Sequence, residues 1–386
     1  MSQFLVRNSA PMASIESLED LNENLNVKCN LTSGMDIQKP EFLDSNFEYK
    51  GYYKFGRILG KGSFGTVVEC FRKSDNKPIA MKFFKKKAIH KWIPESVILD
   101  ETVDFNLLQK SEFFSEANKN RLLPSEVACL LRASKIDGIV KILDYIPPSD
   151  AVNLEPSQET SCSSSDCSDT EMKSLKDDSI IGIVLERDPN EICLFDYLIQ
   201  MDYLEEDEAR VIFKQIVNIS LDLLENLIYH GDLKSENILI NPMTKKIKII
   251  DFGSAQINDI NVTSNSNQRV KRGSLSKCNS KSLMTKPVRT FRGTNLYKPP
   301  EFIVHHCFYP RPSTVWTFGI LLYDMVCGHF PFDKDSDVLT HQDKEIEFVR
   351  SDLSENFRDL IKKCLAFYVA DRLNIEKVLG HPWMNA

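Results

Sequence analysis

The chain has 386 residues, 42% of them hydrophobic, and its formal net charge at pH 7 is −7. This length accommodates two domains with sizeable cores, and the acidic balance excludes an overall attraction to nucleic acid or to an anionic membrane. The ten cysteines lack paired metal-ligand spacing, and the N-terminus lacks the apolar core of a signal peptide. We therefore expect a cytoplasmic protein, with the nucleus as a further location, that binds neither nucleic acid nor membranes.

The pattern along the chain predicts a flexible tail, a β-rich part and a helical part. Residues 1–50 are polar without sustained periodicity, residues 51–187 favour strands, and residues 188–386 favour helices. In the β-rich part we expect strands at Tyr53–Leu59, Thr66–Arg72, Ile79–Phe84 and Val140–Ile146 and a helix at Ser125–Arg132. In the helical part we expect helices at Leu194–Met201, Glu206–Leu227, Val315–Cys327, Glu355–Leu365 and Ile375–Leu379.

Three polar segments interrupt these elements. Residues 93–120 lengthen the connection before the first helix and can be partly helical. Residues 150–178 form a serine-rich acidic run, whereas residues 256–290 are basic, with seven Lys or Arg against the single acid Asp259. Their composition predicts disordered loops of opposite charge.

A glycine-rich segment, ILGKGSFGTVV, lies between two strand-like runs. Its Gly60, Gly62 and Gly65 let backbone N–H groups approach phosphate oxygens without Cβ obstruction. A plain glycine hairpin would look similar, but a dinucleotide-binding loop would need a helix next, and Thr66–Cys70 favours a strand. The segment therefore indicates a phosphate-binding hairpin.

A lysine follows on the apolar strand Ile79–Lys82, 17 residues after the last of these glycines. Burial of an unpaired lysine is costly, so Lys82 is expected to contact a phosphate and a carboxylate. Glu126, in the first turn of the helix PSEVACLL, is the chosen partner. The alternative is an ordinary first-turn glutamate that the helix dipole favours.

The densest cluster of chemical groups is HGDLKSENILINPMTKKIKIIDFG, from His230 to Gly253. Asp232 can accept a hydroxyl proton, Lys234 can neutralise a migrating phosphoryl group, and Asn237 and Asp251 offer oxygen ligands to Mg²⁺. The apolar runs at 238–240 and 247–250 predict two short strands that hold these groups on one hairpin.

Together these motifs resemble a eukaryotic protein kinase, and VLERDPNEICLFDYL, IIDFGSA, GTNLYKPPEF and TVWTFGILLYDMVCGHFPF resemble the Pim family of serine/threonine kinases. The resemblance covers about residues 52–384 and implies an α+β bilobal fold with a small antiparallel β lobe. It implies ATP and Mg²⁺ as cofactors, with Mn²⁺ as an alternative, protein substrates and a monomer. It makes Leu185 the gatekeeper and pairs Glu301 with Arg372. The ATP-binding residues it implies are Leu59, Gly60, Gly62, Gly65, Val67, Ala80, Lys82, Glu126, Glu186 and Asp188.

The chain departs from the usual kinase pattern at three positions. Gly231 replaces the arginine that would bind a phosphate on the activation segment. This change is either drift or the mark of a kinase that is active without that phosphate. Thr314 stands where most kinases carry an aspartate that supports the catalytic loop, an acid that Pim-like kinases also lack. Asp188 replaces a hinge proline of Pim-like kinases and keeps an N–H for a second adenine hydrogen bond.

Pim-like kinases favour basic residues upstream of the target hydroxyl. Asp196 and Glu236 are the candidate acidic groups that bind such residues, although Cys193 stands where another acid is expected. The basic Arg289 and Arg292 predict a relaxed preference.

One internal sequence, RVKRGS, fits that preference and predicts autophosphorylation at Ser274. The alternative is a basic loop with incidental serines. A second hypothesis for the whole chain is a pseudokinase or scaffold, which Gly231 and the charged insertions would suit. The intact set of catalytic groups favours the enzyme.

Overall fold

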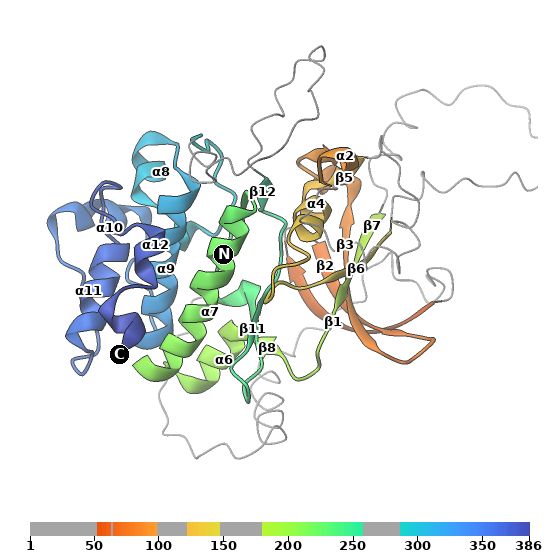
Figure 1. The fold of residues 1–386 in the computed structure, drawn as a ribbon, viewed down its shortest axis with the longest axis horizontal. Coiled ribbons are helices and arrows are strands. Elements are labelled where there is room, and N and C mark those ends of the chain that lie inside the picture. The colour runs from red at the N-terminus through yellow and green to blue at the C-terminus, as the bar shows by residue number, and fades with distance from the viewer. Residues whose placement is uncertain (1–51, 63–64, 99–121, 147–179, 258–285) are drawn as a thin grey trace, which may run out of the picture. The chain divides into compact units, whose positions relative to one another are not determined.

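The computed structural model describes residues 52–62, 65–98, 122–146, 180–257 and 286–386 (Figure 1). The expected tail, most of the three polar segments and Ser274 lie outside these ranges. Two compact units are present: a small unit that runs to Ser134 and resumes at Val140–Asn190, and a helical unit made of Lys135–Ile139 and Glu191–Ala386.

The division between the units differs in detail from the expected boundary after Arg187. Lys135–Ile139 groups with the helical unit because Ile139 forms a parallel bridge with Ile249, whose N–H donates to the Gly138 carbonyl at 2.8 Å. The small unit extends to Asn190, three residues beyond the expected boundary. Long-range backbone hydrogen bonds of this kind leave no periodic pattern in the sequence.

The small unit contains a five-stranded antiparallel sheet in the order β1-β2-β3-β7-β6 (Figure 1). Each of the four expected strands is present, with ends that differ from the predicted ones by at most three residues. The strands are β1 (Tyr53–Gly62), β2 (Gly65–Arg72), β3 (Pro78–Lys85), β6 (Ile142–Ile146) and β7 (Ile180–Glu186).

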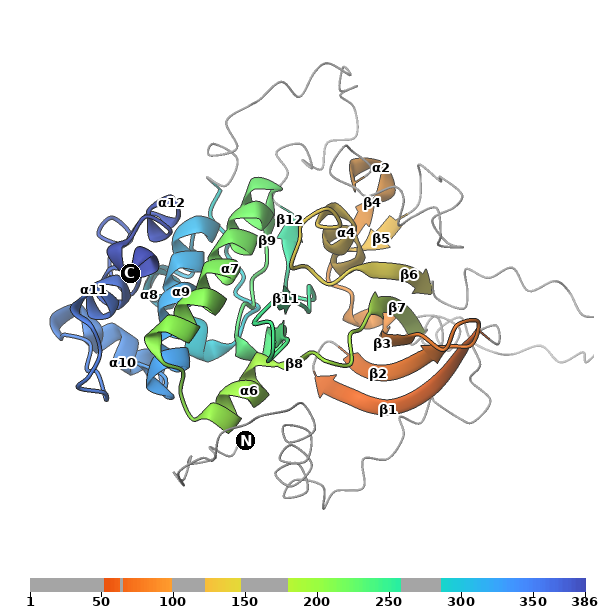
Figure 2. The same cartoon turned by 60° about the horizontal axis from the view of Figure 1, so that its bottom comes forward.

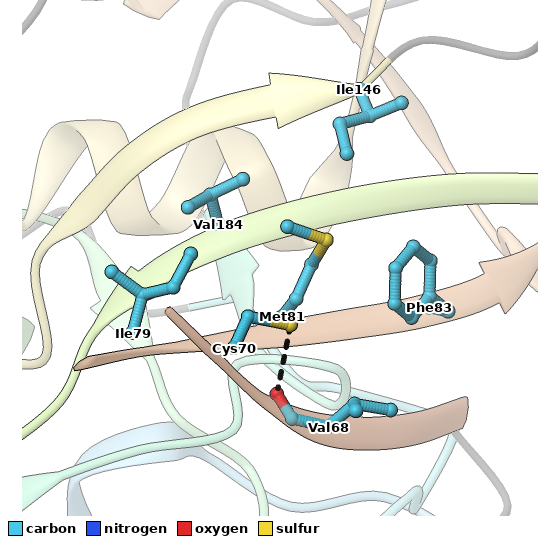
Figure 3. Close-up of a cluster of buried hydrophobic side chains, with 7 residues drawn as sticks. All are labelled: Val68, Cys70, Ile79, Met81, Phe83, Ile146 and Val184. Atoms are coloured by element: carbon cyan, nitrogen blue, oxygen red, sulfur yellow. Dashed lines mark hydrogen bonds between the residues drawn. The ribbon is translucent and has the colours of Figure 1, made fainter. Parts of the chain in front are cut away.

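One face of this sheet carries a hydrophobic core cluster of the small unit. Alternate residues of β2 and β3 point into it and join Ile146 and Val184, as Figure 3 shows. Because side chains alternate along a strand, Ala80 and Lys82 lie on the opposite face of β3. The core cluster consists of Val68, Cys70, Ile79, Met81, Phe83, Ile146 and Val184.

Helix α4 (Ser125–Arg132) has the bounds predicted from the sequence, and every one of its residues is buried. It follows a two-stranded sheet of β4 (Trp92–Pro94) and β5 (Leu122–Pro124). A short helix, α2 (Glu95–Ile98), occupies the described start of the 93–120 segment and packs against α4.

In the helical unit, α7 (Glu206–Glu225) packs against α9 (Pro310–Cys327), as Figure 2 shows. Two small sheets hold the segment from His230 to Gly253. One has the strand order β11-β10-β8, and the other pairs β12 with β9. These strands are β8 (Ile192–Cys193), β9 (Ile228–Tyr229), β10 (Ile238–Ile240), β11 (Ile247–Ile249) and β12 (Gln256–Ile257). The other helices are α6 (Leu194–Met201), α8 (Pro300–His305), α10 (Asp335–Thr340), α11 (Glu355–Cys364) and α12 (Ile375–Val378).

Helix α9 begins at Pro310, five residues before the expected start at Val315. Proline is tolerated in a first helical turn, and nearly all of α9 is buried, so no polar face marks its start in the sequence. Helix α7 ends two residues before the expected Leu227, which adopts a left-handed backbone with φ of 62°. Within the described residues, no helix combines the length and apolarity needed to span a membrane.

Candidate active site

Lys82 and Glu126 form a buried ion pair in the small unit. Lys82 Nζ lies 2.6 Å from Glu126 Oε1, and the two side chains are only 5% and 9% exposed. The pairing predicted from the sequence is therefore present. Such a pair fixes the lysine ammonium on the face of the sheet opposite the core.

The three glycines of the glycine-rich segment differ in how closely other atoms surround them. Gly62 pairs with Gly65 at the end of the β1–β2 hairpin, and a Cβ at Gly65 would lie 2.2 Å from the Phe83 carbonyl oxygen. Gly65 is thus required for the close approach of β2 to β3. A Cβ at Gly60 or Gly62 would meet no atom within 4 Å, so packing of the described residues does not explain these two glycines, which stay predicted phosphate-binding positions.

The other expected nucleotide-binding side chains lie on the same sheet. Val67 pairs with Lys82, and Ala80 pairs with Leu185. Paired residues of neighbouring strands share a face, so all four lie opposite the core cluster. Leu59 on β1 is 39% exposed. This face therefore offers small and apolar side chains beside a fixed cation.

The expected hinge, Glu186–Asp188, is held by hydrogen bonds and an ion pair to neighbouring residues. Glu186 Oε1 accepts from the Lys141 N–H at 3.0 Å, and Arg187 forms an ion pair with Glu69 at 2.8 Å. Asp188 Oδ1 accepts from the backbone N–H and the side-chain amide of Asn190 at 2.9 and 3.0 Å. The Asp188 side chain therefore closes a turn after the hinge, a role that proline could not supply.

On the helical unit, the carboxylate of Asp232 is held on both sides. Its Oδ1 accepts from the Thr294 N–H at 2.8 Å and from Thr294 Oγ1 at 2.9 Å. Its Oδ2 accepts from Asn237 Nδ2 at 3.2 Å and lies 3.6 Å from Lys234 Nζ. Lys234 Nζ also donates to Thr294 Oγ1 at 2.9 Å. The predicted acid and lysine are thus adjacent, with orientations fixed by neighbouring polar groups.

His230 supports the backbone of this loop rather than its chemistry. Its Nδ1 accepts from the Asp232 N–H at 3.3 Å, so its Nε2 carries the proton and donates to the Ile250 carbonyl at 3.1 Å. The ring also packs edge-on against Phe252 at 5.0 Å. The His230 side chain therefore connects the catalytic loop to the end of β11.

Asn237 and Asp251 lie at adjacent ends of the β10–β11 hairpin, because the Ile250 N–H donates to the Asn237 carbonyl at 2.9 Å. Both hydrogen bonds from Asn237 Nδ2 go to Asp232, which leaves Oδ1 as the amide atom suited to ligating a cation. Asp251 adopts a left-handed backbone with φ of 59°, a conformation common at functional sites. The two residues supply the oxygen ligands that a divalent cation prefers.

Gly231 has a backbone conformation that residues with a side chain rarely adopt. Its φ is 79°, and a Cβ there would lie 2.8 Å from the Ser254 carbonyl oxygen. A Cβ at Gly293 would in turn lie 2.5 Å from the Gly231 carbonyl oxygen. The catalytic loop, residues 230–237, and the end of the activation segment, at Gly293, are therefore in contact through their backbones.

Thr314, the second departure from the usual pattern, forms a hydrogen bond within its own helix. Its Oγ1 donates to the Pro310 carbonyl at 2.8 Å within α9. The side chain is buried, with 7% exposure. The threonine satisfies its own helix, as threonines often do.

The candidate substrate-binding acids lie close to Cys193, because α6 and β8 both pack against the short helix η3 (Ser235–Asn237). Asp196 and Glu236 are both exposed. The Cys193 thiol lies 3.5 Å from the carbonyls of Ser235 and Glu236. Burial, followed by the nearby Asp196 carboxylate, raises the pKa of Cys193 to about 11. The thiol is therefore a neutral donor and cannot replace the missing acid.

Comparison with known proteins identifies the family. Residues 169–384 match the family described as the protein kinase domain. The chain belongs to the protein kinase family. It is 29% identical over 357 residues to the zebrafish serine/threonine-protein kinase pim-2, covering 91% of this chain and 89% of that protein. It is 28% identical over 338 residues to the Caenorhabditis elegans serine/threonine-protein kinase prk-2, covering 87% of this chain and 59% of that one.

These relatives place the kinase in the serine/threonine class, as its sequence predicts, and its fold is the expected α+β protein kinase fold. The predicted pair of Glu301 and Arg372 is also present, with hydrogen bonds of 3.0 and 2.8 Å between both ends of the two groups. The arginine side chain is 1% exposed. This bidentate pair lies buried within the helical unit of the kinase.

The sequence analysis of the kinase missed two residues beside its catalytic loop. Thr294 bonds to both Asp232 and Lys234, and Ser254 Oγ donates to the Arg292 carbonyl at 3.0 Å. The only sequence signal for Thr294 is its place in GTNLYKPPEF, 62 residues after Asp232. Ser254 follows the DFG motif directly and carries no other signal.

Proposed function

We propose that this kinase transfers the γ-phosphoryl group of ATP to Ser or Thr hydroxyls that follow basic residues, without prior phosphorylation of its own activation segment. The observation that carries the chemistry is the oriented Asp232 carboxylate with Lys234 3.6 Å away. Asp232 accepts the proton of the attacking hydroxyl, and Lys234 offsets negative charge that develops on the transferred group. Thr294 holds both side chains in place.

Mg²⁺ is the proposed metal, with Mn²⁺ as an alternative. Asn237 and Asp251 would hold it through oxygen atoms, which suits a cation that binds to few protein ligands alongside phosphate oxygens. When bound, the ion offsets phosphate charge and orients the γ-phosphoryl group. Lys82, fixed by Glu126 at 2.6 Å, would bind the other phosphates.

Three contacts of the activation segment support activity without a phosphate. The Val288 and Phe308 backbones exchange hydrogen bonds of 2.7 and 3.0 Å. The Phe291 ring packs on Phe302 and Phe308 at centroid distances of 5.5 and 6.1 Å. Ser254 holds the Arg292 carbonyl. Hydrophobic packing and backbone hydrogen bonds thus take the role that an arginine–phosphate pair has in other switches.

The preference for basic substrates rests on Asp196 and Glu236. Helix α6, which carries Asp196, packs against η3, which carries Glu236. Desolvation raises the pKa of Asp196, and an arriving arginine would favour the ionised form again. Arg289 is exposed and of opposite sign, so the proposed preference is relaxed.

The test is phosphate transfer from ATP·Mg²⁺ to a peptide with arginine at positions −5 and −3, by the dephosphorylated full chain. Turnover is expected from the unmodified protein and is expected to be lost in Lys82→Met and Asp251→Asn. Replacing both arginines with alanine should raise the peptide KM. Activity that appears only after incubation with an upstream kinase would contradict the phosphate-independent part alone, and no turnover on any basic peptide would contradict the whole proposal.

Autophosphorylation at Ser274, outside the described residues, is proposed from its basic context. Intact mass and peptide mapping after incubation with ATP check it, and an unmodified Ser274 would refute it. A monomeric state and a cytoplasmic location with nuclear access are proposed from the sequence alone. Sedimentation and imaging of the tagged protein test them.

A further inference from the structure

Two positions at which the kinase departs from the usual pattern, Gly231 and Thr314, line the same small cavity. The cavity has a volume of about 20 Å³ and lies behind the catalytic loop, among α7, β9 and α9. Its wall also includes Ser220 of α7 and the loop residue His230. None of the residues proposed to bind ATP or the metal ion is among its lining residues.

One polar group in this cavity has no hydrogen-bond partner among the residues that the structure describes. Ser220 is only 5% exposed, and its Oγ makes no hydrogen bond in the structure. A buried hydroxyl without a partner is unfavourable and is normally satisfied by ordered water. Thr314 Oγ1 donates to Pro310 and keeps lone pairs that can accept a further hydrogen bond.

The size of the cavity matches one water molecule. A cavity needs about 10–15 Å³ of free volume to hold one water molecule, and that water needs about two to four polar partners. Ser220, Thr314 and the backbone of the loop at His230 and Gly231 provide polar groups around the space. A purely apolar cavity of this size would stay empty, but this one contains an unsatisfied hydroxyl.

We propose that this cavity binds one ordered water, which links Ser220 Oγ and Thr314 Oγ1 to the backbone of the catalytic loop. Ser220 is then a positioning residue for Asp232, acting through the water and the loop. By resemblance, most kinases support this loop with an aspartate at the position of Thr314. Here two hydroxyl groups and a water supply hydrogen bonds without burying a charge.

The direct test is a high-resolution crystal structure of the full chain. Density for a water within hydrogen-bond distance of Ser220 Oγ is expected, together with its loss or displacement in Ser220→Ala. A dry cavity would overturn the proposal, as would a Ser220 rotamer that donates to a carbonyl of its own helix. This readout does not depend on phosphotransfer, so it separates this inference from the proposed function.

The kinetic test, which rests on the proposed phosphotransfer, compares three variants. Ser220→Ala and Thr314→Val each remove one partner of the water, and each should lower kcat by about two- to tenfold with the ATP KM unchanged. Leu223→Val is the matched control, because it removes apolar volume from the same wall and keeps both hydroxyls. It should lower Tm but not kcat. Unchanged kcat in Ser220→Ala, or an equal loss in Leu223→Val, would refute a positioning role.

Discussion

Restoring the arginine that most kinases carry next to the catalytic aspartate should impair this one. Gly231 has φ of 79°, and a left-handed backbone costs an L-residue about 1–2 kcal/mol. The Cβ would also lie 2.8 Å from the Ser254 carbonyl oxygen, so the loop would have to shift. If the active arrangement of Asp232 requires this backbone, Gly231→Arg should lower kcat by about five- to thirtyfold.

The assay is steady-state transfer to the arginine peptide, with Tm measured in parallel. The same cost of about 1–2 kcal/mol should lower Tm by about 2–8 °C. Gly231→Ala adds the Cβ without the charge and should show a similar loss. Gly380→Ala is the neutral control, because its Cβ would make an ordinary contact at 3.7 Å. Wild-type kcat and Tm in Gly231→Arg would refute the conformational argument and favour simple drift at this position.

Three further predictions concern pairs and charges outside the glycine. Lys82→Met removes the ammonium 2.6 Å from the buried Glu126 carboxylate, so chemical denaturation should show a loss of about 3–5 kcal/mol in the free energy of unfolding in addition to lost turnover; a loss below about 1 kcal/mol would contradict the burial argument. Asp188→Pro removes a backbone N–H and should raise the ATP KM, whereas an unchanged KM would argue against a second adenine hydrogen bond. Desolvation raises the pKa of Asp196, so this carboxylate loses its charge as pH falls through a value above that of an ordinary aspartate, and the KM of the arginine peptide should rise in that pH range. Asp196→Asn should remove this pH dependence. A peptide with alanine in place of the arginines should lack it with both the unmodified kinase and the variant.

The sequence by itself determined the elements and groups whose evidence is local. Strand-like runs predicted β2 and β3 and put Lys82 on an apolar strand. The polar first turn and apolar face of α4 fixed both its bounds and the place of Glu126. Asp232, Lys234, Asn237 and Asp251 could be predicted because they lie in one short segment around the β10–β11 hairpin, so their spacing along the chain constrains their spacing in space.

Only the tertiary structure decided what surrounds those groups. Thr294 reaches Asp232 across 62 residues, and the carbonyls near the Cys193 thiol are 42 and 43 residues away. The left-handed backbone of Gly231 and the unsatisfied Ser220 hydroxyl likewise depend on how segments pack. Periodicity and spacing report which face of an element is buried. They carry no record of which distant backbone atom lies against it, and that contact decides here how the catalytic aspartate is held.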